Sequence, residues 1–457
     1  MEDFLKFLGG LLWGIPMIIL LSGTHLIMTA KTGIIQRHTF RAIKLSVTKD
    51  ISAEGDISPF QALTTALAST IGTGNIIGLG TAVALGGAGA VFWCWVTGIF
   101  GIATKYAESL LAVKYRIKTE DGRLCGGAMY ILESRLHLRG LAKMFAVCTM
   151  LSSIGIGCGV QINAISETLT TAIPNGKNYF VAVPGRNFPA IPLLVGIISA
   201  IILCAVIFGG VKSISKVCEM LVPVMAGLYI FGNIIILIYN FDVLPETFKV
   251  IVSSAFTKTS AAGGLTGYSV GAAVRYGISR GLFSNESGIG SSPMISAAAK
   301  CKNPVRQALI SSTGTFWDTV VLCMVTGLVI VSSIIKNDNI DISQLSGSEL
   351  TYTVFRQIPY IGKPILVFGL VTFAFSTILG WSFYGERCAE YLFGLKSITI
   401  YRVFYVAMLV IAPMISIDMM WTMADIFNAL MAIPNLTALL LLRNEVRYET
   451  RNGIAKI

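Results

Sequence analysis

Long apolar runs separated by short polar segments recur along almost the whole chain. A helix needs about 20 predominantly apolar residues to cross the hydrocarbon core of a bilayer. Eleven runs come close to that length or exceed it: 8–29, 62–86, 89–112, 142–171, 188–209, 217–240, 268–300, 308–334, 362–385, 401–418 and 421–442. The pattern therefore predicts an all-α polytopic membrane protein with about 11 transmembrane helices.

The run 62–86 is interrupted by the polar sequence IGTGNIIGLG at residues 71–80. Glycine weakens a helix, and Thr and Asn carry hydrogen-bonding groups that lipid cannot satisfy. Within a bilayer, non-helical backbone persists only where protein or a water-filled cavity covers it. We therefore expect residues 72–75 to break a spanning helix beside a cavity.

The interruption would expose backbone groups that can bind a solute or an ion. N–H groups freed near Thr73 and Gly74 would form the positive dipole end of a half-helix, which suits a carboxylate. Carbonyl groups near Ala68 and Ile71 would be free to coordinate a hard cation such as sodium, which prefers oxygen. The alternative is a packing seam, because Gly74 and Gly78 form a GxxxG pair. A run of four polar or glycine residues exceeds what packing needs and favours a binding site.

A second polar interruption, FSNESGIGSSP at residues 283–293, lies within the run 268–300. Interrupted segments at corresponding positions in two halves of a chain point to the binding site of a secondary transporter. Asn285 is the natural neutral hydrogen-bonding group for a bound solute at this break.

The sequence TFAFSTILGWSFYGER at residues 372–387 is a third candidate region. Thr377 and Trp381 are spaced i, i+4 and share a helix face, where a Trp beside a small hydroxyl residue would limit the size of a bound side chain. Ser376 and Thr377 can each lend a hydroxyl oxygen to a cation, with the carbonyl of Phe373 one turn earlier. An ordinary hydrogen bond between helices remains an open alternative for these hydroxyls.

Polar and charged side chains also lie inside other predicted spans. Gln161 and Asn163 are either cavity groups or polar contacts between helices, and both interpretations stay open. Glu286 is either a coupling carboxylate or a brace for free N–H groups, and we favour the brace, with Arg275 and Arg280 as its partners. The remaining acids mark either an ion path or, as we favour for each, a structural pair: Glu167, Asp318 and Asp425.

The composition supports a membrane protein and explains the charge. Hydrophobic residues make up 54% of the 457 and charged residues 13%, about half the charged share of a soluble domain. The net charge is +11, but Lys and Arg concentrate in alternate loops, with 24 in one set and 8 in the other. This bias predicts an N-terminus outside and a C-terminus in the cytoplasm, and it argues against nucleic-acid binding.

The sequence lacks the signatures of an enzyme. Its three histidines, His25, His38 and His137, are far apart, and it contains no Walker A sequence, so we expect neither a histidine-metal site nor ATP as the energy source. The nine cysteines contain no C-x-x-C pair, and we expect them to be reduced packing residues. A channel and a membrane-embedded hydrolase are alternatives. Two interruptions and a Trp wall favour an occluding pocket over a pore, and a hydrolase would need a catalytic dyad.

The spans divide the chain into two groups of five after the first helix is set aside. An odd number of helices in each group forces the second group into the opposite orientation. The predicted division is an N-terminal extra helix, a cytoplasmic connector, two five-helix repeats and a cytoplasmic tail: 1–30, 31–61, 62–240, 268–442 and 443–457.

Five motifs give the chain a specific resemblance. Residues 71–108, 280–290 (RGLFSNESGIG), 303–309 (NPVRQAL), 375–387 (FSTILGWSFYGER) and 423–436 (MADIFNALMAIPNL) resemble the alanine/glycine:cation symporter family of prokaryotes. That family, also known for sodium:alanine symport, is related to the amino acid-polyamine-organocation superfamily. The resemblance implies a leucine-transporter-like 5+5 inverted repeat with one additional helix. It also implies sodium-coupled uptake of alanine or glycine across a prokaryotic plasma membrane by alternating access.

The resemblance also implies roles for individual residues. Thr73, Gly74 and Asn75 would receive the carboxylate of the amino acid. The substrate pocket would be completed by Gln161, Asn285, Thr377 and Trp381. Sodium, as a co-transported ion rather than a cofactor, would be held by the carbonyl groups of Ala68, Ile71 and Phe373 and the hydroxyl groups of Ser376 and Thr377. Proton coupling through Glu286 is the alternative within transport.

Overall fold

The computed structural model describes residues 9–48, 54–183, 186–257, 269–337, 340, 342, 345–360, 362–415 and 417–457. These residues are almost entirely helical, as predicted. The helices of twelve or more residues are α2 (Ile15–Thr32), α4 (Pro59–Thr70), α6 (Gly89–Lys114), α8 (Arg139–Ser152), α9 (Gln161–Ala172), α10 (Ala190–Ile207), α11 (Gly210–Tyr239), α12 (Leu244–Phe256), α13 (Val270–Asn285), α15 (Pro304–Thr315), α16 (Met324–Lys336), α18 (Gly362–Phe393), α19 (Ser397–Ile411), α20 (Ile417–Leu441) and α21 (Arg443–Ile454). The shorter ones are α3 (Thr39–Ser46), α5 (Leu79–Gly86), α7 (Ala128–Tyr130), α14 (Pro293–Ala297) and α17 (Gly347–Phe355).

Two small antiparallel hairpins complete the regular structure. Strand β1 (Ile117–Lys118) pairs with β2 (Leu124–Cys125), and β3 (Phe180–Val183) pairs with β4 (Arg186–Pro189). Both hairpins lie in connections between long helices, so they do not alter the all-α architecture.

Most of the predicted spans appear as long apolar helices. Among the described residues, nine helices are long and apolar enough to cross a membrane, and α4 with α5 makes a tenth as a pair bent by 53°. The eleventh run, 268–300, is not one helix, because α13 ends at Asn285 and α14 covers only Pro293–Ala297. The second predicted interruption therefore divides this run, as the first divides 62–86.

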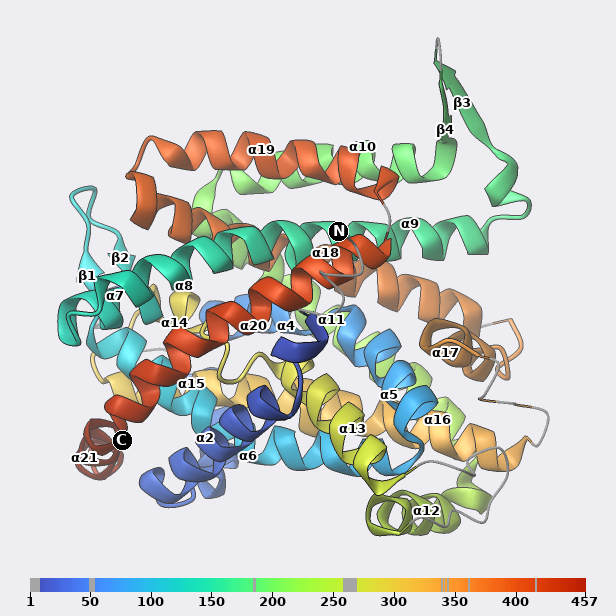
Figure 1. The fold of residues 1–457 in the computed structure, drawn as a ribbon, viewed down its shortest axis with the longest axis horizontal. Helices are drawn as coiled ribbons and strands as arrows, with labels where there is room; N and C mark the ends of the chain where they lie inside the picture. The colour runs from blue at the N-terminus through green and yellow to red at the C-terminus, as the bar shows by residue number, and fades with distance from the viewer. Residues whose placement is uncertain are drawn as a thin grey trace.

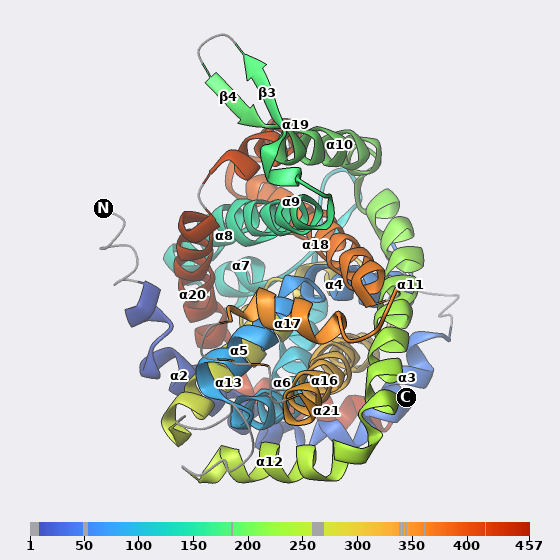
Figure 2. The same cartoon turned by 90° about the vertical axis from the view of Figure 1, so that its right-hand side faces the viewer.

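The long helices pack as two groups with the broken helix α4–α5 between them. Helix α6 packs against α13 and α15, and α2 lies against α6. Helix α18 packs against α4, α8, α9 and α11, while α10 packs on α19. Figure 1 shows α10 and α19 along one side and α2, α6 and α12 along the other, and Figure 2 shows the same arrangement end-on. The two breaks are consequently buried at the centre of the molecule.

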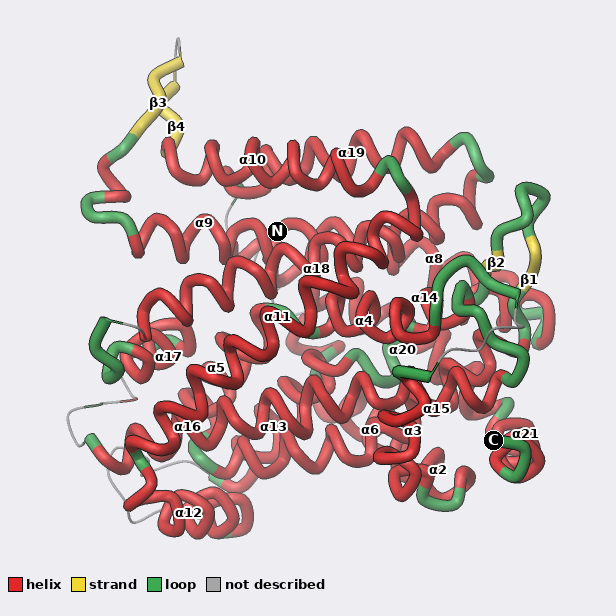
Figure 3. Tube along the Cα trace, turned by 180° about the vertical axis from the view of Figure 1, so that it is seen from behind, coloured by secondary structure: helices red, strands yellow, loops and turns green. Residues whose placement is uncertain are grey.

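The helices run roughly along one axis, so the molecule has two ends (Figures 1 and 3). One end carries α12, α17 and the β3–β4 hairpin, and we call it the α17 end. The other carries α7, α21 and the β1–β2 hairpin, and we call it the α21 end. The distribution of Lys and Arg predicts that the α21 end faces the cytoplasm.

The outer faces of several helices expose apolar side chains, which is typical of contact with lipid. These side chains lie on α10, α11 and α19 and include Ile198, Ile201, Phe231, Ile238, Ile400 and Val403.

Candidate functional site

The first break begins where α4 ends. A capping box between Ser58 and Gln61 starts α4, and the helix continues to Thr70. Ile71 then adopts an extended conformation, with φ −75° and ψ 96°, before a π-helical segment over Gly74–Gly78 leads into α5. The helix is therefore interrupted at Ile71 and Gly72, inside the predicted segment.

Asn75 stabilises this break rather than facing a cavity. Its Oδ1 accepts a hydrogen bond from the backbone N–H of Gly72 at 3.0 Å. Its Nδ2 donates to the carboxylate of Asp318 at 2.7 Å and to the Asp318 carbonyl at 3.1 Å. The side chain is fully buried, so both ends of its amide are used within the protein.

A small cavity of about 20 Å³ lies beside the break, and we call it the central cavity. Of the residues predicted to bind substrate, four line it: Gly74, Gln161, Thr377 and Trp381. Thr73, Asn75 and Asn285 do not line it. Its other lining residues, which the sequence reasoning did not assign to a pocket, are Ser69, Thr70, Gly72, Ile156, Phe283, Ser284 and Glu286. A space of this size can hold about one water molecule, so the walls must separate before an amino acid enters.

Three polar atoms near the central cavity are buried and have no hydrogen-bond partner among the described residues. They are Oγ1 of Thr73, Oε1 of Gln161 and Nδ2 of Asn285. A buried polar group without a partner costs about 1–3 kcal/mol. All three belong to residues predicted to contact substrate, and a ligand could satisfy them.

Five oxygen atoms predicted to hold sodium lie together between α4 and α18. The hydroxyl of Thr377 lies 3.2 Å from the carbonyl oxygen of Ala68, 3.3 Å from that of Ile71 and 3.0 Å from that of Phe373. The hydroxyl of Ser376 lies 3.1 Å from the carbonyl oxygen of Ala68 and 2.9 Å from that of Phe373. Oxygen ligands that coordinate a hard cation at about 2.3–2.6 Å lie about as far from one another as these five oxygens do. The cluster is thus compact enough to surround a small monovalent ion.

Two glycines allow α4 and α18 to approach this closely. A Cβ atom on Gly72 would lie 2.7 Å from Oγ1 of Thr377. One on Gly380 would lie 2.6 Å from Cβ of Ser69. Both distances are shorter than van der Waals contact, so any side chain at either position would push the helices apart.

The second break, Glu286–Ser292, is held by carboxylates. Glu286 is in the left-handed region with φ 52°, and its Oε1 accepts a hydrogen bond from Nε1 of Trp381 at 3.1 Å. Its Oε2 accepts one from the hydroxyl of Ser291. The expectation that Arg275 and Arg280 pair with Glu286 is wrong, because these two arginines stack on aromatic rings instead.

Residues from neighbouring helices brace the same break. Oε1 of Glu108 on α6 accepts hydrogen bonds from the N–H of Gly288 at 2.9 Å and from Nδ2 of Asn435 at 2.6 Å. Lys105, also on α6, donates to the hydroxyl of Ser292 at 2.6 Å and is within electrostatic reach of Glu108 and Glu286. Neither α6 residue was predicted to brace the break, although a Lys and a Glu three residues apart in an apolar run were a visible signal.

The other polar residues singled out from the sequence are mostly structural. Asp318 accepts hydrogen bonds from Asn75, Ser284 and Thr319. Asn163 donates to two backbone carbonyls, of Gly159 at 2.9 Å and Ala412 at 3.0 Å, and so joins segments of two helices. Glu167 is exposed on α9. Asp425 lies in a different cavity, nearer the α17 end.

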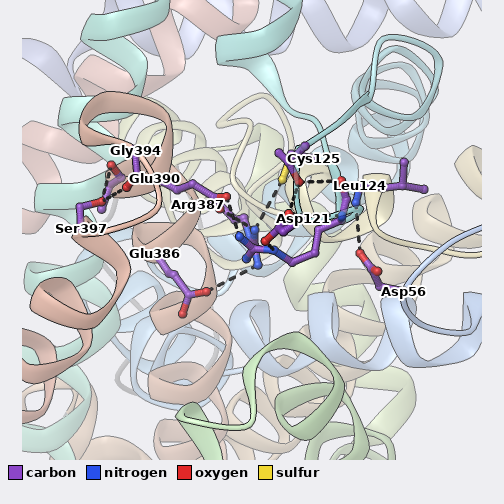
Figure 4. Close-up of polar contacts among 12 residues, drawn as sticks. Asp56, Asp121, Leu124, Cys125, Glu386, Arg387, Glu390, Gly394 and Ser397 are labelled. Atoms are coloured by element: carbon purple, nitrogen blue, oxygen red, sulfur yellow. Dashed lines mark hydrogen bonds and ion pairs between the residues drawn. The ribbon is translucent and has the colours of Figure 1, made fainter.

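A charged network closes the α21 end beyond the central cavity. Figure 4 shows Arg387 and Glu390 of α18 beside the β1–β2 hairpin, where Arg387 reaches Cys125, while Glu386 pairs with Arg387 on its other side. Glu390 pairs with Arg123 of that hairpin at 2.8 Å and with Arg387 at 2.6 Å. Glu386 pairs with Arg402 of α19 at 2.7 Å. These contacts would have to separate for a path to open on this side.

The chain is similar to known membrane transporters. A family model described as the sodium:alanine symporter family matches residues 1–453. The sodium/alanine symporter AgcS of Methanococcus maripaludis is 44% identical over 446 residues, which cover 96% of this chain and 94% of that protein. The crystal structure of MhsT in complex with L-phenylalanine superposes with a TM-score of 0.58 at 14% identity, covering 88% of this chain and 99% of that one.

A second solved structure has the same architecture. A Na⁺-coupled sialic acid symporter in its substrate-bound outward-open state gives a TM-score of 0.52 at 12% identity, covering 97% of this chain and 87% of that one. The predicted leucine-transporter-like fold is therefore confirmed.

Proposed function

The chain belongs to the sodium:alanine symporter family, and from that premise we propose that it imports small neutral amino acids, alanine and glycine above all, together with sodium. The protein is a multi-pass membrane transporter of amino acids and not an enzyme.

The oxygen cluster between α4 and α18 carries the proposal of sodium coupling. Its carbonyl and hydroxyl oxygens are neutral hard ligands, the kind that suits a monovalent alkali cation rather than a transition metal. Thr377 belongs to this cluster and also lines the central cavity. Sodium bound there would tie α4 to α18 and fix one wall of the substrate site.

The walls of the central cavity favour a substrate with a small side chain. The indole of Trp381 is fully buried and is held by Glu286 at 3.1 Å and by an edge contact with Tyr384, whose ring centre lies 5.6 Å away. A ring fixed at both ends cannot easily move aside for a long side chain. We propose that Thr73 and Gly74 receive the carboxylate of the amino acid, that Gln161, Asn285 and Thr377 complete the polar contacts, and that Trp381 limits side-chain size.

Asn75 has an indirect part in this proposal. Because its amide already bonds to Gly72 and Asp318, it would position the N–H groups of the break rather than touch substrate. The ion would be held by the oxygens of Ala68, Ile71, Phe373, Ser376 and Thr377.

Alternating access would require the central cavity, which is too small for an amino acid, to open towards one end of the molecule at a time. We propose that the α17 end faces outward and the α21 end faces the cytoplasm, in keeping with the bias of Lys and Arg. Sodium and amino acid would enter from the α17 end, and the ion pairs of Arg387, Glu390 and Arg123 would separate to release them. The membrane potential supplies about 2.3 kcal/mol per charge per 100 mV for inward movement.

Proton coupling through Glu286 is the competing proposal. Both carboxylate oxygens of Glu286 accept hydrogen bonds, from Trp381 and from Ser291, which favours a bracing role. The test is alanine uptake into proteoliposomes with a sodium gradient, a proton gradient, both or neither. We expect uptake to follow the sodium gradient and to survive collapse of the proton gradient with an uncoupler. Uptake that does not depend on the sodium gradient would reject the proposal.

A further inference from the structure

A pocket of about 420 Å³ lies at the α21 end, between the last turn of α2 and helix α21. Figures 1 and 3 show these two helices beside each other, and they pack against one another. We call it the basic pocket, because four of its lining residues are cationic and none is acidic. The four are Lys31, Arg37, Arg447 and Arg451. A pocket lined by charges of one sign favours an anion.

Helix α21 carries its acidic and basic side chains on different faces. Glu445 and Glu449 are spaced i, i+4, and both pair with Lys114 of α6, at 2.5 and 2.8 Å. Arg447 and Arg451 have the same spacing but lie two positions further along, a turn of about 200° around the helix. The acids are therefore neutralised against α6, while the two exposed arginines present their charge to the basic pocket.

The other two cations contact neutral groups. Nζ of Lys31 donates a hydrogen bond to the amide oxygen of Asn444 at 2.9 Å, and Nε of Arg37 donates one to the ring of His38 at 3.2 Å. No carboxylate in the described part of the chain forms an ion pair with any of the four cations of the basic pocket. The positive charge of the pocket is thus not balanced by the protein residues around it.

An apolar ridge on α2 leads to the basic pocket. Ile15, Ile19 and Ile27 are 69%, 65% and 39% exposed. With Gly23 they form one i, i+4 row that continues to Lys31. Residues four apart lie one above the other on the same helix face, and exposed apolar side chains of this kind are typical of contact with lipid. An acyl chain along this ridge would bring its headgroup to Lys31.

The basic pocket lies at the depth expected for lipid headgroups. The apolar helix that contains α2 covers Gly9–Thr32, which is 24 residues and corresponds to a length of about 36 Å. The hydrocarbon core of a bilayer is about 30 Å thick, so a helix that spans it ends among the headgroups. Residues 30–33 line the basic pocket at this end of α2. A free anion would use only the pocket, whereas a phospholipid would use both the pocket and the ridge.

We propose that the basic pocket binds the phosphate group of an anionic phospholipid, whose acyl chain lies along the ridge of Ile15, Ile19 and Ile27. Arg447 and Arg451 donate charge-assisted hydrogen bonds to the phosphate oxygens, and the lipid joins α2 to α21. The inference goes beyond the proposed function, because its ligand comes from the surrounding membrane and is not transported.

The test measures lipid binding by the purified, delipidated full-length protein in detergent. Native mass spectrometry during titration with dioleoylphosphatidylglycerol should show a single retained lipid, and dioleoylphosphatidylcholine at the same concentrations should not. Each Lys or Arg beside an anionic lipid contributes about fivefold in affinity. The double variant Arg447→Gln, Arg451→Gln should therefore bind phosphatidylglycerol about twenty-fivefold more weakly. The double variant Arg447→Lys, Arg451→Lys keeps both charges and should retain most of the affinity, which separates lost charge from failed folding.

Lys143 and Lys396 provide the matched control. Both are exposed, at the starts of α8 and α19 at the α21 end, and neither lines the basic pocket. The double variant Lys143→Gln, Lys396→Gln removes the same amount of charge and should leave the affinity for phosphatidylglycerol unchanged. Inorganic phosphate, equimolar with the lipid, should not displace it, because phosphate has no acyl chain to lie on the ridge.

Three results would overturn the inference. Unchanged binding by Arg447→Gln, Arg451→Gln would remove the lipid from the basic pocket. An equal loss of affinity in Lys143→Gln, Lys396→Gln would mean that diffuse surface charge attracts the lipid. Displacement by equimolar inorganic phosphate would assign the pocket to a free anion. Each of these results leaves sodium-coupled uptake intact, because that proposal is tested separately by alanine transport.

Discussion

The two breaks occupy corresponding positions in the two halves of the chain, yet their chemistry differs. At the first, Ile71–Gly72, the carbonyl oxygens of Ala68 and Ile71 accept hydrogen bonds from neutral hydroxyl groups of α18. At the second, Glu286–Ser292, the freed groups are met by carboxylates, such as that of Glu108 on the N–H of Gly288. The first break thus keeps oxygens that a cation can use, whereas the second is filled by the protein itself.

Asp318 connects the two breaks and fixes their distance. Its carboxylate accepts hydrogen bonds from Asn75 beside the first break and from Ser284 near the end of α13, just before the second, at 2.7 and 2.8 Å. The difference between the breaks shows that a repeated topology can place two helix interruptions side by side although the two have different functions. We infer that the first break binds the ion and the carboxylate of the substrate, and that the second mainly supports it, although Glu286 lines the same cavity.

The largest effect should come from blocking the first break directly. In Gly72→Ala the new methyl group would lie 2.7 Å from Oγ1 of Thr377, and such overpacking costs about 1–3 kcal/mol. We expect the initial rate of alanine uptake into proteoliposomes to fall by about tenfold to a hundredfold. Gly314→Ala is the control, because a Cβ atom there would have its nearest neighbour at 3.8 Å. Near-normal uptake by Gly72→Ala would mean that the first break is not the binding element.

The second largest effect should appear in the sodium requirement. Thr377→Ala removes the hydroxyl that lies within 3.3 Å of three carbonyl oxygens. We expect the sodium concentration for half-maximal uptake to rise by about tenfold or more, as for loss of one contact to a charge. Thr377→Ser keeps the oxygen and should restore most of the wild-type response. The ion would have to be placed elsewhere if Thr377→Ala changed neither alanine affinity nor sodium dependence.

A smaller effect should show whether Trp381 limits the size of the substrate or only supports Glu286 through its hydrogen bond. Trp381→Ala should enlarge the central cavity and let longer aliphatic amino acids compete with alanine, by about fourfold for each buried methylene, from about 0.8 kcal/mol per CH₂. Trp381→Phe keeps most of the ring but loses the hydrogen bond to Glu286, so it should retain the wild-type preference. Unchanged selectivity in Trp381→Ala would remove this residue from the substrate site.

The smallest effect on transport should come from the second break. Glu108→Ala removes the acceptor for Gly288 and Asn435 and leaves a buried N–H unpaired, at a cost of about 1–3 kcal/mol. We expect the apparent melting temperature of the purified protein to fall by a few degrees while the half-saturating sodium concentration stays constant. Glu108→Gln retains an acceptor oxygen and should lose less stability. A shifted sodium response without a change in melting temperature would make the second break a binding element as well.

Much of this arrangement could be predicted from the sequence. Apolar runs and their polar interruptions locate both breaks, because lipid tolerates so few polar residues that each cluster stands out. Four of the predicted oxygen ligands for the ion, from Ala68, Ile71, Ser376 and Thr377, lie together in the structure.

The orientation of individual polar side chains could not be predicted in the same way. Asn75 turns to Asp318, 243 positions away in the chain, and Glu286 bonds to Trp381 instead of the nearby arginines. Periodicity identifies the face of a helix, but the partner of a buried amide or carboxylate depends on which distant helix covers that face. The bracing role of Lys105 and Glu108 was missed for the same reason.

The contact between Gly380 and Ser69 has a consequence for the choice among alkali metals. It sets the width of the gap between α4 and α18, one turn of helix from the hydroxyls of Ser376 and Thr377. If the ion binds in that gap, the width of the gap decides which ionic radius fits. Lithium, sodium and potassium carry the same charge and differ mainly in that radius. Discrimination against potassium, the main cation of the cytoplasm, would then depend on a residue that has no side chain and never touches the metal.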